Sequence, residues 1–185
     1  MLRTFLAMAA LAAPLHAAPL WLEDYDAALK TASTTGKYVL VDVTGSDWCP
    51  PCQQMEAEVF SRPGFSAAAE RYVLLRLDYP RTIAQSEKIK AQNKKLAQRY
   101  PFDGVPTYFM LDGKGDAFGK YTGYLPGGVT AFLSLARNFE TQKDVLDKLA
   151  VTVLNAAPGV DRARAQDALY RQAEDWELQW RYADL

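Results

Sequence analysis

The sequence predicts an α/β protein with a mixed central sheet flanked by helices, followed by a helical C-terminal extension. Three observations support this fold class. Short apolar runs at 38–43, 72–78 and 107–112 alternate with helical patterns in the order β-α-β-α-β-β-α, after an N-terminal helix. A tight-turn sequence at 112–115 predicts that the last two strands are antiparallel, whereas the earlier strands are separated by enough chain for parallel crossovers. From residue 128 onward the pattern is helical.

The first helix and the first strand follow from the spacing of apolar residues. Apolar side chains recur on one side of a helix that begins near residue 24: Tyr25, Ala28, Leu29 and Ala32. Gly36 is a typical C-terminal stop for that helix. The strand at 38–43 is nearly all apolar, as expected for a strand covered on both faces of a sheet, and Asp42 interrupts it.

The middle of the chain supplies the remaining elements of the sheet. A helix is expected over 51–60, and a strand over 72–78 follows a further short helix. Residues 83–99, which are rich in Lys and Gln, are expected to form an exposed helix. A third strand is expected over 107–112, and the fourth strand ends near Tyr121.

The C-terminal region predicts two more helical stretches. Residues 141–155 continue a helical stripe, and Pro158 and Gly159 interrupt it. A last helix carries apolar residues at helical spacing: Leu169, Ala173, Trp176 and Trp180. Two arrangements are open. Either these helices pack back on the domain, or they form a dimerisation or partner surface, because exposed tryptophan is unfavourable without a partner.

The first 17 residues have the layout of a secretory signal peptide. Arg3 precedes an apolar run from Phe5 to Leu15 that is too short for a membrane span, and small residues follow it. We expect cleavage after Ala17 and a periplasmic or secreted protein without stable membrane insertion; an uncleaved anchor or a buried core helix is the alternative. The chain then divides into a signal peptide at 1–17, an α/β domain at 18–140 and a helical extension at 141–185.

Composition excludes several classes of function. The single histidine, His16, lies in the segment that is expected to be removed, which excludes a Cys/His zinc site and a histidine-activated nucleophile. Gln53 stands where a C-x-x-C-H haem attachment site needs histidine. With 21 basic and 22 acidic side chains, the charge gives no reason to expect a nucleic-acid partner. No metal and no cofactor are expected.

Cys49 and Cys52 are the two cysteines of the chain, and they lie between the first strand and the start of a helix. Unpaired N–H groups and the dipole potential at a helix start favour a thiolate. The i, i+3 spacing brings both sulfurs within disulfide range, so one thiol can attack a substrate disulfide and the other can resolve the mixed disulfide. A permanent structural disulfide is the alternative, but so short a loop removes little entropy from the unfolded chain.

Two segments carry a resemblance to a known family. VLVDVTGSDWCPPC at 39–52 and GVPTYFMLDGKG at 104–115, together with the order of elements, resemble the thioredoxin superfamily. The chain is most similar to exported thioredoxin-like thiol–disulfide proteins that carry a TGSDWC-x-x-C variant. The resemblance covers about residues 22–140, and it implies a thioredoxin-like fold for the domain at 18–140.

The resemblance also implies roles for residues around the cysteine pair. Cys49 would be the nucleophile and Cys52 the buried resolving thiol. Trp48 would be the ring beside the site. Pro106 would be the family's cis-proline, facing the disulfide, and Val105 would offer its backbone N–H and C=O groups to an extended substrate.

Asp42 would be the buried carboxylate behind Cys52, able to take its proton during resolution. Six residues separate Asp42 from Cys49, where the better-known thioredoxins have five. Either the segment 45–47 bulges to absorb the extra residue, or Asp42 is merely an acid at a strand edge. Arg76 is expected either to lie near Asp42 and modulate it or to lie at the edge of the sheet.

The dipeptide between the cysteines predicts the direction of the chemistry. Pro50 and Pro51 lack N–H groups, and no histidine lies between the cysteines to supply positive charge. The strongest oxidants of this type owe their strength to an unusually stabilised thiolate. We therefore expect a midpoint potential at or below about −200 mV, on the reducing side.

These observations predict an exported thiol–disulfide oxidoreductase that reduces or exchanges disulfides in other exported proteins. Its partners would be disulfide-containing exported proteins and an electron donor that the sequence does not identify. Three alternatives are a disulfide oxidase or isomerase, a redox-inert peptide-binding module in which Cys49 and Cys52 form a structural disulfide, and a copper chaperone. The last would lack a histidine to complete a soft metal site.

Overall fold

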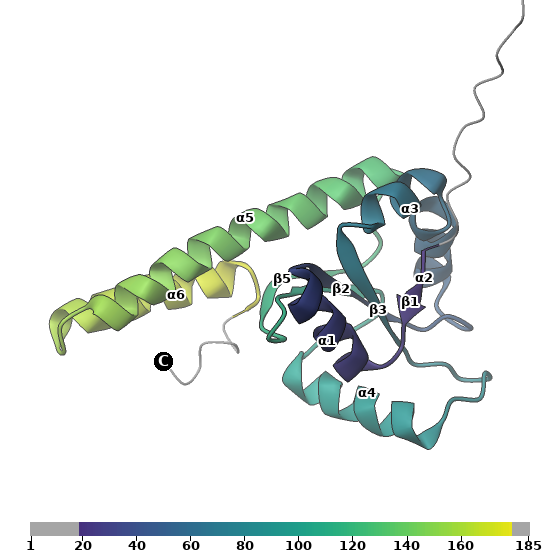
Figure 1. The fold of residues 1–185 in the computed structure, drawn as a ribbon, viewed down its shortest axis with the longest axis horizontal. Coiled ribbons are helices and arrows are strands. Elements are labelled where there is room, and N and C mark those ends of the chain that lie inside the picture. The colour runs from purple at the N-terminus through teal and green to yellow at the C-terminus, as the bar shows by residue number, and fades with distance from the viewer. Residues whose placement is uncertain (1–18, 179–185) are drawn as a thin grey trace, which may run out of the picture.

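The computed structural model describes residues 19–178, which form a mixed sheet with helices on both faces (Figure 1). The expected signal peptide at 1–17 and Trp180 lie outside the described residues. The strands are β1 (Trp21–Leu22), β2 (Tyr38–Thr44), β3 (Tyr72–Asp78), β4 (Thr107–Leu111) and β5 (Ala117–Thr122). The helices are α1 (Tyr25–Thr35), α2 (Pro50–Met55), η1 (Glu56–Phe60), α3 (Pro63–Ala69), α4 (Glu87–Arg99), α5 (Gly128–Asn155) and α6 (Val160–Asp175).

The sheet has the order β1-β3-β2-β4-β5. Strands β1, β3 and β2 are parallel, whereas β4 is antiparallel to β2 and β5 is antiparallel to β4. This confirms the expected change from parallel to antiparallel pairing. The edge strand β1 was not expected, because its two residues are too few to show an alternating pattern.

Two expected helices differ in their details. The helix expected over 51–60 consists of α2 and then a wider π-helical turn, η1, that begins at Glu56. The helix expected over 83–99 begins only at Glu87, because the hydroxyl of Ser86 accepts the Ile89 N–H group and caps the helix there. The segment 79–86 between β3 and α4 is therefore a loop.

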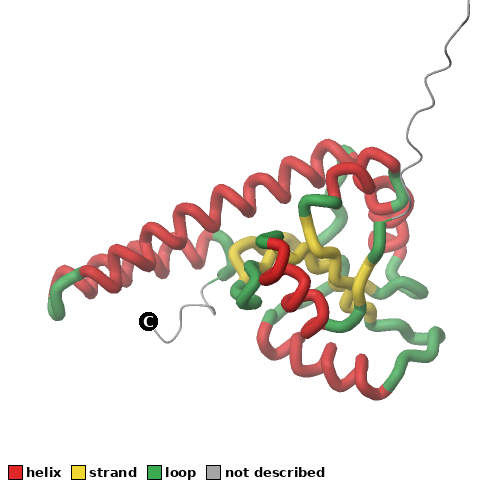
Figure 2. The backbone as a smooth tube through the Cα atoms, viewed as in Figure 1, coloured by secondary structure: helices red, strands yellow, loops and turns green. Residues whose placement is uncertain are grey.

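Each face of the sheet has its own hydrophobic core. Val39, Val41 and Val43 of β2 belong to the core beneath α1 and α4. Leu40 belongs to the other core, beneath α2, α3 and α5. Because side chains alternate along a strand, Asp42 points to the same face as Leu40, towards α2. The tube in Figure 2 shows the sheet enclosed by helices on both sides.

The C-terminal extension projects from the sheet as a pair of helices. Helix α5 has 28 residues and passes residue 140 without interruption, and its second half packs against α6 (Figure 1). After α6 the chain returns to β5, where Glu177 pairs with Lys120 at 2.9 Å and Leu178 is buried in the core beneath α1. The helices thus pack partly on the domain and partly on each other. The domain boundary at residue 140 stays a prediction.

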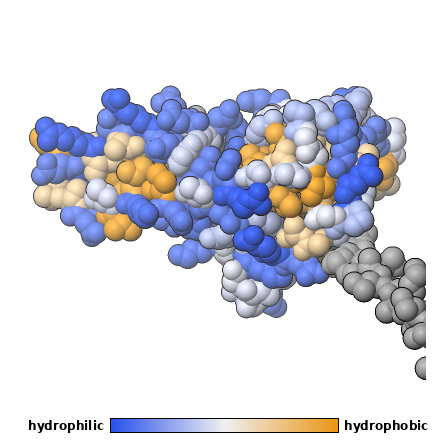
Figure 3. All heavy atoms as spheres, turned by 90° about the horizontal axis from the view of Figure 1, so that it is seen from above, coloured by the Kyte–Doolittle hydropathy of each residue, from blue (hydrophilic) through white to orange (hydrophobic). Residues whose placement is uncertain are grey.

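Large apolar side chains are exposed at the far end of this extension. Val151, Leu154 and Val160 have 53%, 68% and 65% of their surface exposed. Figure 3 shows hydrophobic residues interspersed with charged ones over this part of the molecule. Within residues 19–178, not one helix combines the length and the apolar character that crossing a membrane requires.

Gly119 provides a test of how α5 packs on the sheet. A Cβ atom at this β5 position would lie 2.1 Å from Cγ of Phe139, whose ring is buried. We expect Gly119→Ala to lower the free energy of unfolding by about 3 kcal/mol in urea titration, because an overpacked core must shift. Gly64→Ala is the matched control, since its nearest atom is at 3.7 Å. Equal stability of the two variants would contradict this packing.

Candidate active site

Cys49 and Cys52 form a disulfide at the start of α2, with their Cα atoms 5.2 Å apart. Cys49 is the N-cap residue of the helix, and its sulfur accepts the N–H group of Cys52 at 3.2 Å. The prolines between them have no N–H group to offer. Both cysteines are buried, at 2% and 5% exposure, so burial does not distinguish a nucleophile from a resolving thiol.

The loop before β4 faces the disulfide. The carbonyl oxygen of Val105 lies 3.6 Å from the sulfur of Cys49. The peptide bond between Val105 and Pro106 is cis, as the sequence predicts. The carbonyl group of Pro106 accepts the N–H group of Gly123 at 2.8 Å, which joins this loop to the end of β5. The structure thus brings the expected proline loop and the expected cysteine pair together.

A turn between β2 and α2 absorbs the extra residue of this segment. The carbonyl oxygen of Gly45 accepts the N–H groups of both Trp48, at 3.1 Å, and Cys49, at 2.9 Å. Asp42 therefore stays within β2, which lies between β3 and β4 in the middle of the sheet. The possibility that Asp42 is an acid at a strand edge is excluded.

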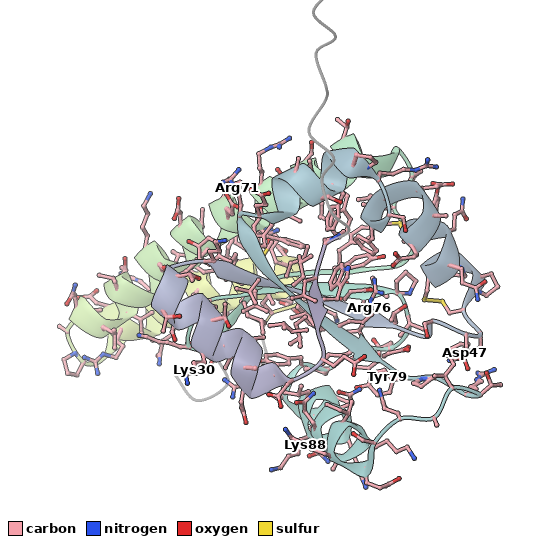
Figure 4. All side chains as sticks on the ribbon, turned by 45° about the vertical axis from the view of Figure 1, so that its right-hand side comes forward. Lys30, Asp47, Arg71, Arg76, Tyr79 and Lys88 are labelled. Carbon is pink, nitrogen blue, oxygen red and sulfur yellow. A yellow bond between two sulfur atoms is a disulfide. The ribbon has the colours of Figure 1, made fainter. Side chains whose placement is uncertain are left out.

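Asp42 belongs to a network of charged side chains beneath α2. Arg76 lies directly opposite Asp42 in the register of β2 and β3, and its Nε donates to Asp42 Oδ2 at 3.2 Å. The Nη2 of Arg76 donates to Glu56 Oε2 at 2.6 Å. The guanidinium also lies over the ring of Trp21, 4.6 Å from its centroid. Arg76 points into the space between the sheet and α2 (Figure 4). Of the two expected positions for Arg76, the one near Asp42 is therefore confirmed.

Burial is the main reason why the pKa of Asp42 is raised. It raises the pKa of Asp42 from 3.8 to about 7, with Arg76 opposing the shift and the Glu56 and Asp78 carboxylates adding to it. A pocket of about 290 Å³ connects the network to the cysteine pair, because Asp42, Arg76, Glu56 and Cys52 all line it. Asp42 therefore titrates near neutral pH, in a pocket that Cys52 also lines.

Trp48 is held in place on several sides. Its Nε1 donates to the carbonyl oxygen of Tyr79 at 2.8 Å. A Cβ atom on Gly45 would lie 2.4 Å from the indole ring, so only glycine permits this contact. The guanidinium of Arg81 lies over the ring, 3.9 Å from its centroid. Trp48 directly precedes Cys49 in the chain, and Arg81 covers one face of its ring; its role beside the site stays a prediction.

Further contacts fasten the segment before Cys49 to the segment after β3. The carboxylate of Asp47 accepts the backbone N–H groups of Arg81, Thr82 and Ile83, and also the Thr82 hydroxyl. These hydrogen bonds, the Thr82 side chain first, lower the pKa of Asp47. Sequence reasoning missed Asp47, Arg81 and Tyr79, because no local pattern relates positions about thirty residues apart.

Residues 25–136, more than half of the chain, match the protein family described as a thioredoxin-like domain. The chain belongs to the thioredoxin-like family. The expected thioredoxin-like fold is thereby confirmed for this part of the chain. The match ends within α5, so most of the helical extension lies beyond it.

Three similar proteins illustrate the relationship. Disulfide bond reductase DsbH of Chlamydia pneumoniae is 29% identical over 126 residues, which are 68% of this chain and 75% of that protein. Thiol:disulfide interchange protein DsbD 2 of Pseudomonas aeruginosa is 33% identical over 93 residues, which are 50% of this chain but only 14% of that protein. A solved structure of a DsbH oxidoreductase has a TM-score of 0.65 at 26% identity and covers 72% of this chain and 92% of its own.

The raised pKa of Asp42 predicts how stability depends on pH. A carboxyl whose pKa is higher in the folded state binds more protons there, so the folded state loses stability as the pH rises from about 4 towards 7. Asp42→Asn removes this loss. In the oxidised protein at pH 8, we expect the variant to be more stable than the wild type by about 1–4 kcal/mol in urea titration.

The advantage of Asp42→Asn should shrink towards pH 5, where Asp42 is protonated in the folded protein. Asp26→Asn is the control, because Asp26 is an exposed acid on α1. It should change stability alike at both pH values. A wild type that is more stable than Asp42→Asn at pH 8 would contradict this prediction. It would show that the attraction of Arg76 stabilises the charged Asp42 by more than burial destabilises it.

Proposed function

We propose that this chain is an exported thiol–disulfide oxidoreductase that reduces or exchanges disulfides in other exported proteins. The observation that carries the proposal is the position of the Cys49–Cys52 disulfide, which lies at the start of α2 and against the Val105 carbonyl. The family membership and the names of the relatives support disulfide exchange. The direction of the reaction and the identity of the substrates are the proposed part.

The first step is an attack by Cys49 on the substrate disulfide. The Cys49 thiolate is stabilised by the N–H group of Cys52, which its sulfur already accepts in the disulfide form. Attack forms a mixed disulfide between Cys49 and one substrate sulfur, and the other substrate sulfur leaves as a thiolate that takes up a proton. The backbone of Val105, whose carbonyl oxygen lies next to the sulfur, would hold an extended substrate chain there.

The second step is resolution by Cys52. Its thiol gives up a proton and attacks the sulfur of Cys49, so that the Cys49–Cys52 disulfide forms and the reduced substrate leaves. Asp42 shares the pocket with Cys52 and has a pKa of about 7, which makes it the proposed proton acceptor. Two electrons pass to the substrate, and an external dithiol donor must return two electrons to the cysteine pair.

The proposed location is the periplasm or the extracellular space. The pattern of the first 17 residues supports export, with cleavage after Ala17. An oxidising compartment also supplies the class of substrate, because disulfides persist there. The proposed partners are disulfide-containing exported proteins and a donor of reducing equivalents.

Insulin reduction with dithiothreitol tests this function. The wild type should accelerate the precipitation of insulin chains well beyond dithiothreitol alone, whereas Cys49→Ser and Cys52→Ser should not. Cys52→Ser should also accumulate a mixed disulfide with insulin through Cys49, which mass spectrometry would detect. A wild type that gives no acceleration over the reductant would exclude the proposed function and leave a redox-inert binding module.

The midpoint potential tests the proposed direction. Only one N–H group reaches the Cys49 sulfur among the described residues, so the reduced form gains little stabilisation. We expect a potential at or below about −200 mV in a glutathione titration. Pro51→His should raise it, because histidine restores an N–H donor and adds a cation beside the thiolate, whereas Gln53→His, outside the dipeptide, should raise it less. A wild-type value near about −120 mV would favour a disulfide oxidase instead.

A further inference from the structure

Arg81 lies in the loop 79–86, and Asp47 fixes its backbone beside the cysteine pair. The N–H groups of Arg81, Thr82 and Ile83 donate to the Asp47 carboxylate at 3.0, 2.6 and 3.1 Å. Asp47 is two residues before Cys49 in the chain. Figure 4 shows Asp47 next to the disulfide, at the edge of the molecule. The loop is thus attached to the active-site segment.

The side chain of Arg81 covers the aromatic surface at this edge of the site. Its guanidinium lies 3.9 Å from the centroid of the Trp48 ring, and Trp48 directly precedes Cys49. A cation over an indole face is a favourable contact. A substrate that approaches Cys49 past Trp48 therefore meets the guanidinium group that covers one face of the ring.

The guanidinium of Arg81 has no acidic partner within residues 19–178. No ion pair or side-chain hydrogen bond is formed by this group among those residues, in contrast to Arg76, which contacts both Asp42 and Glu56. Asp47 is nearby, but its carboxylate is occupied by the loop N–H groups and the Thr82 hydroxyl. Arg81 is exposed, so its N–H donors remain available to a ligand.

We propose that Arg81 selects substrates that carry an acidic side chain within about two residues of the disulfide-forming cysteine. This inference rests on the proposed function. A carboxylate is the group that fits, because the planar guanidinium binds it with two parallel hydrogen bonds. The acid must be close to the cysteine, because Arg81 reaches over Trp48, the neighbour of Cys49, and one extended residue spans about 3.3 Å.

Two disulfide-linked fluorogenic peptides test the proposal. They are identical except that the residues next to cysteine are glutamate in one and lysine in the other. Dithiothreitol re-reduces the enzyme after each turnover. For each peptide, the kcat/KM of the wild type is divided by the rate constant for reduction of that peptide by dithiothreitol alone. We expect the wild type to prefer the acidic peptide by about threefold to fivefold at low ionic strength, the size of an exposed ion pair. The preference should disappear in about 1 M salt.

Three variants separate charge from packing. Arg81→Gln keeps a planar amide over Trp48 but should lose the preference, and Arg81→Glu should reverse it. Lys30→Glu, an equal charge change on α1, should keep the wild-type preference, since Lys30 is exposed and lies far from Asp47 in Figure 4. The midpoint potential of Arg81→Gln should equal that of the wild type, because the charge acts on the substrate.

The outcomes distinguish this inference from the function on which it rests. A wild type that turns over both peptides equally would overturn the role of Arg81 and leave the oxidoreductase function intact. Equal losses on both peptides in Arg81→Gln, or a shifted potential, would also overturn it, because they would indicate support of Trp48 or of the Cys49 thiolate. A wild type that turns over neither peptide would overturn the proposed function and this inference with it.

Discussion

Asp42 is a carboxyl group buried at 3% exposure in the middle of the sheet, opposite Arg76 on the neighbouring strand. A buried charge costs several kcal/mol unless it is paired or neutralised. Asp42 is both paired and partly neutralised. Arg76 contacts the carboxylate, and burial raises the pKa of Asp42 to about 7. The register of β2 against β3 fixes this pair, and the pocket that Asp42 and Arg76 line is also lined by Cys52.

The edge of the site beside Trp48 depends on a second set of contacts, between chain segments about thirty residues apart. Asp47 holds the loop that follows β3, and the indole of Trp48 donates to the carbonyl group of Tyr79. Cys52 thus lines a pocket together with a titratable acid, and the tryptophan before Cys49 is covered by the cation of a loop. We propose that the Asp42–Arg76 contacts serve the proton transfer and that the loop contacts determine which charges a substrate meets.

Local patterns in the sequence were enough to predict most of the fold and the chemistry. Strands β2 to β5, the turn at 112–115 and the cysteine pair each have a signature within a few consecutive residues. The placement of Asp42 could not be decided in that way, because it depends on how the turn at Gly45 absorbs one residue. Contacts such as Asp47 with the loop at 81–83, and the late start of α4, arise from tertiary packing and a single cap.

The most direct test of this account is the pH dependence of resolution, measured in a single turnover. Reduced wild-type protein is mixed rapidly with an excess of the symmetric disulfide of a fluorescent thiol, so that the mixed disulfide forms on Cys49, and the second release of thiol, by Cys52, is followed from pH 5 to 9. We predict a rate that rises with pH, with an inflection near pH 7, the pKa of Asp42, and that loses this inflection in Asp42→Asn. An inflection that persists unchanged in Asp42→Asn would contradict the assignment of Asp42 as the proton acceptor.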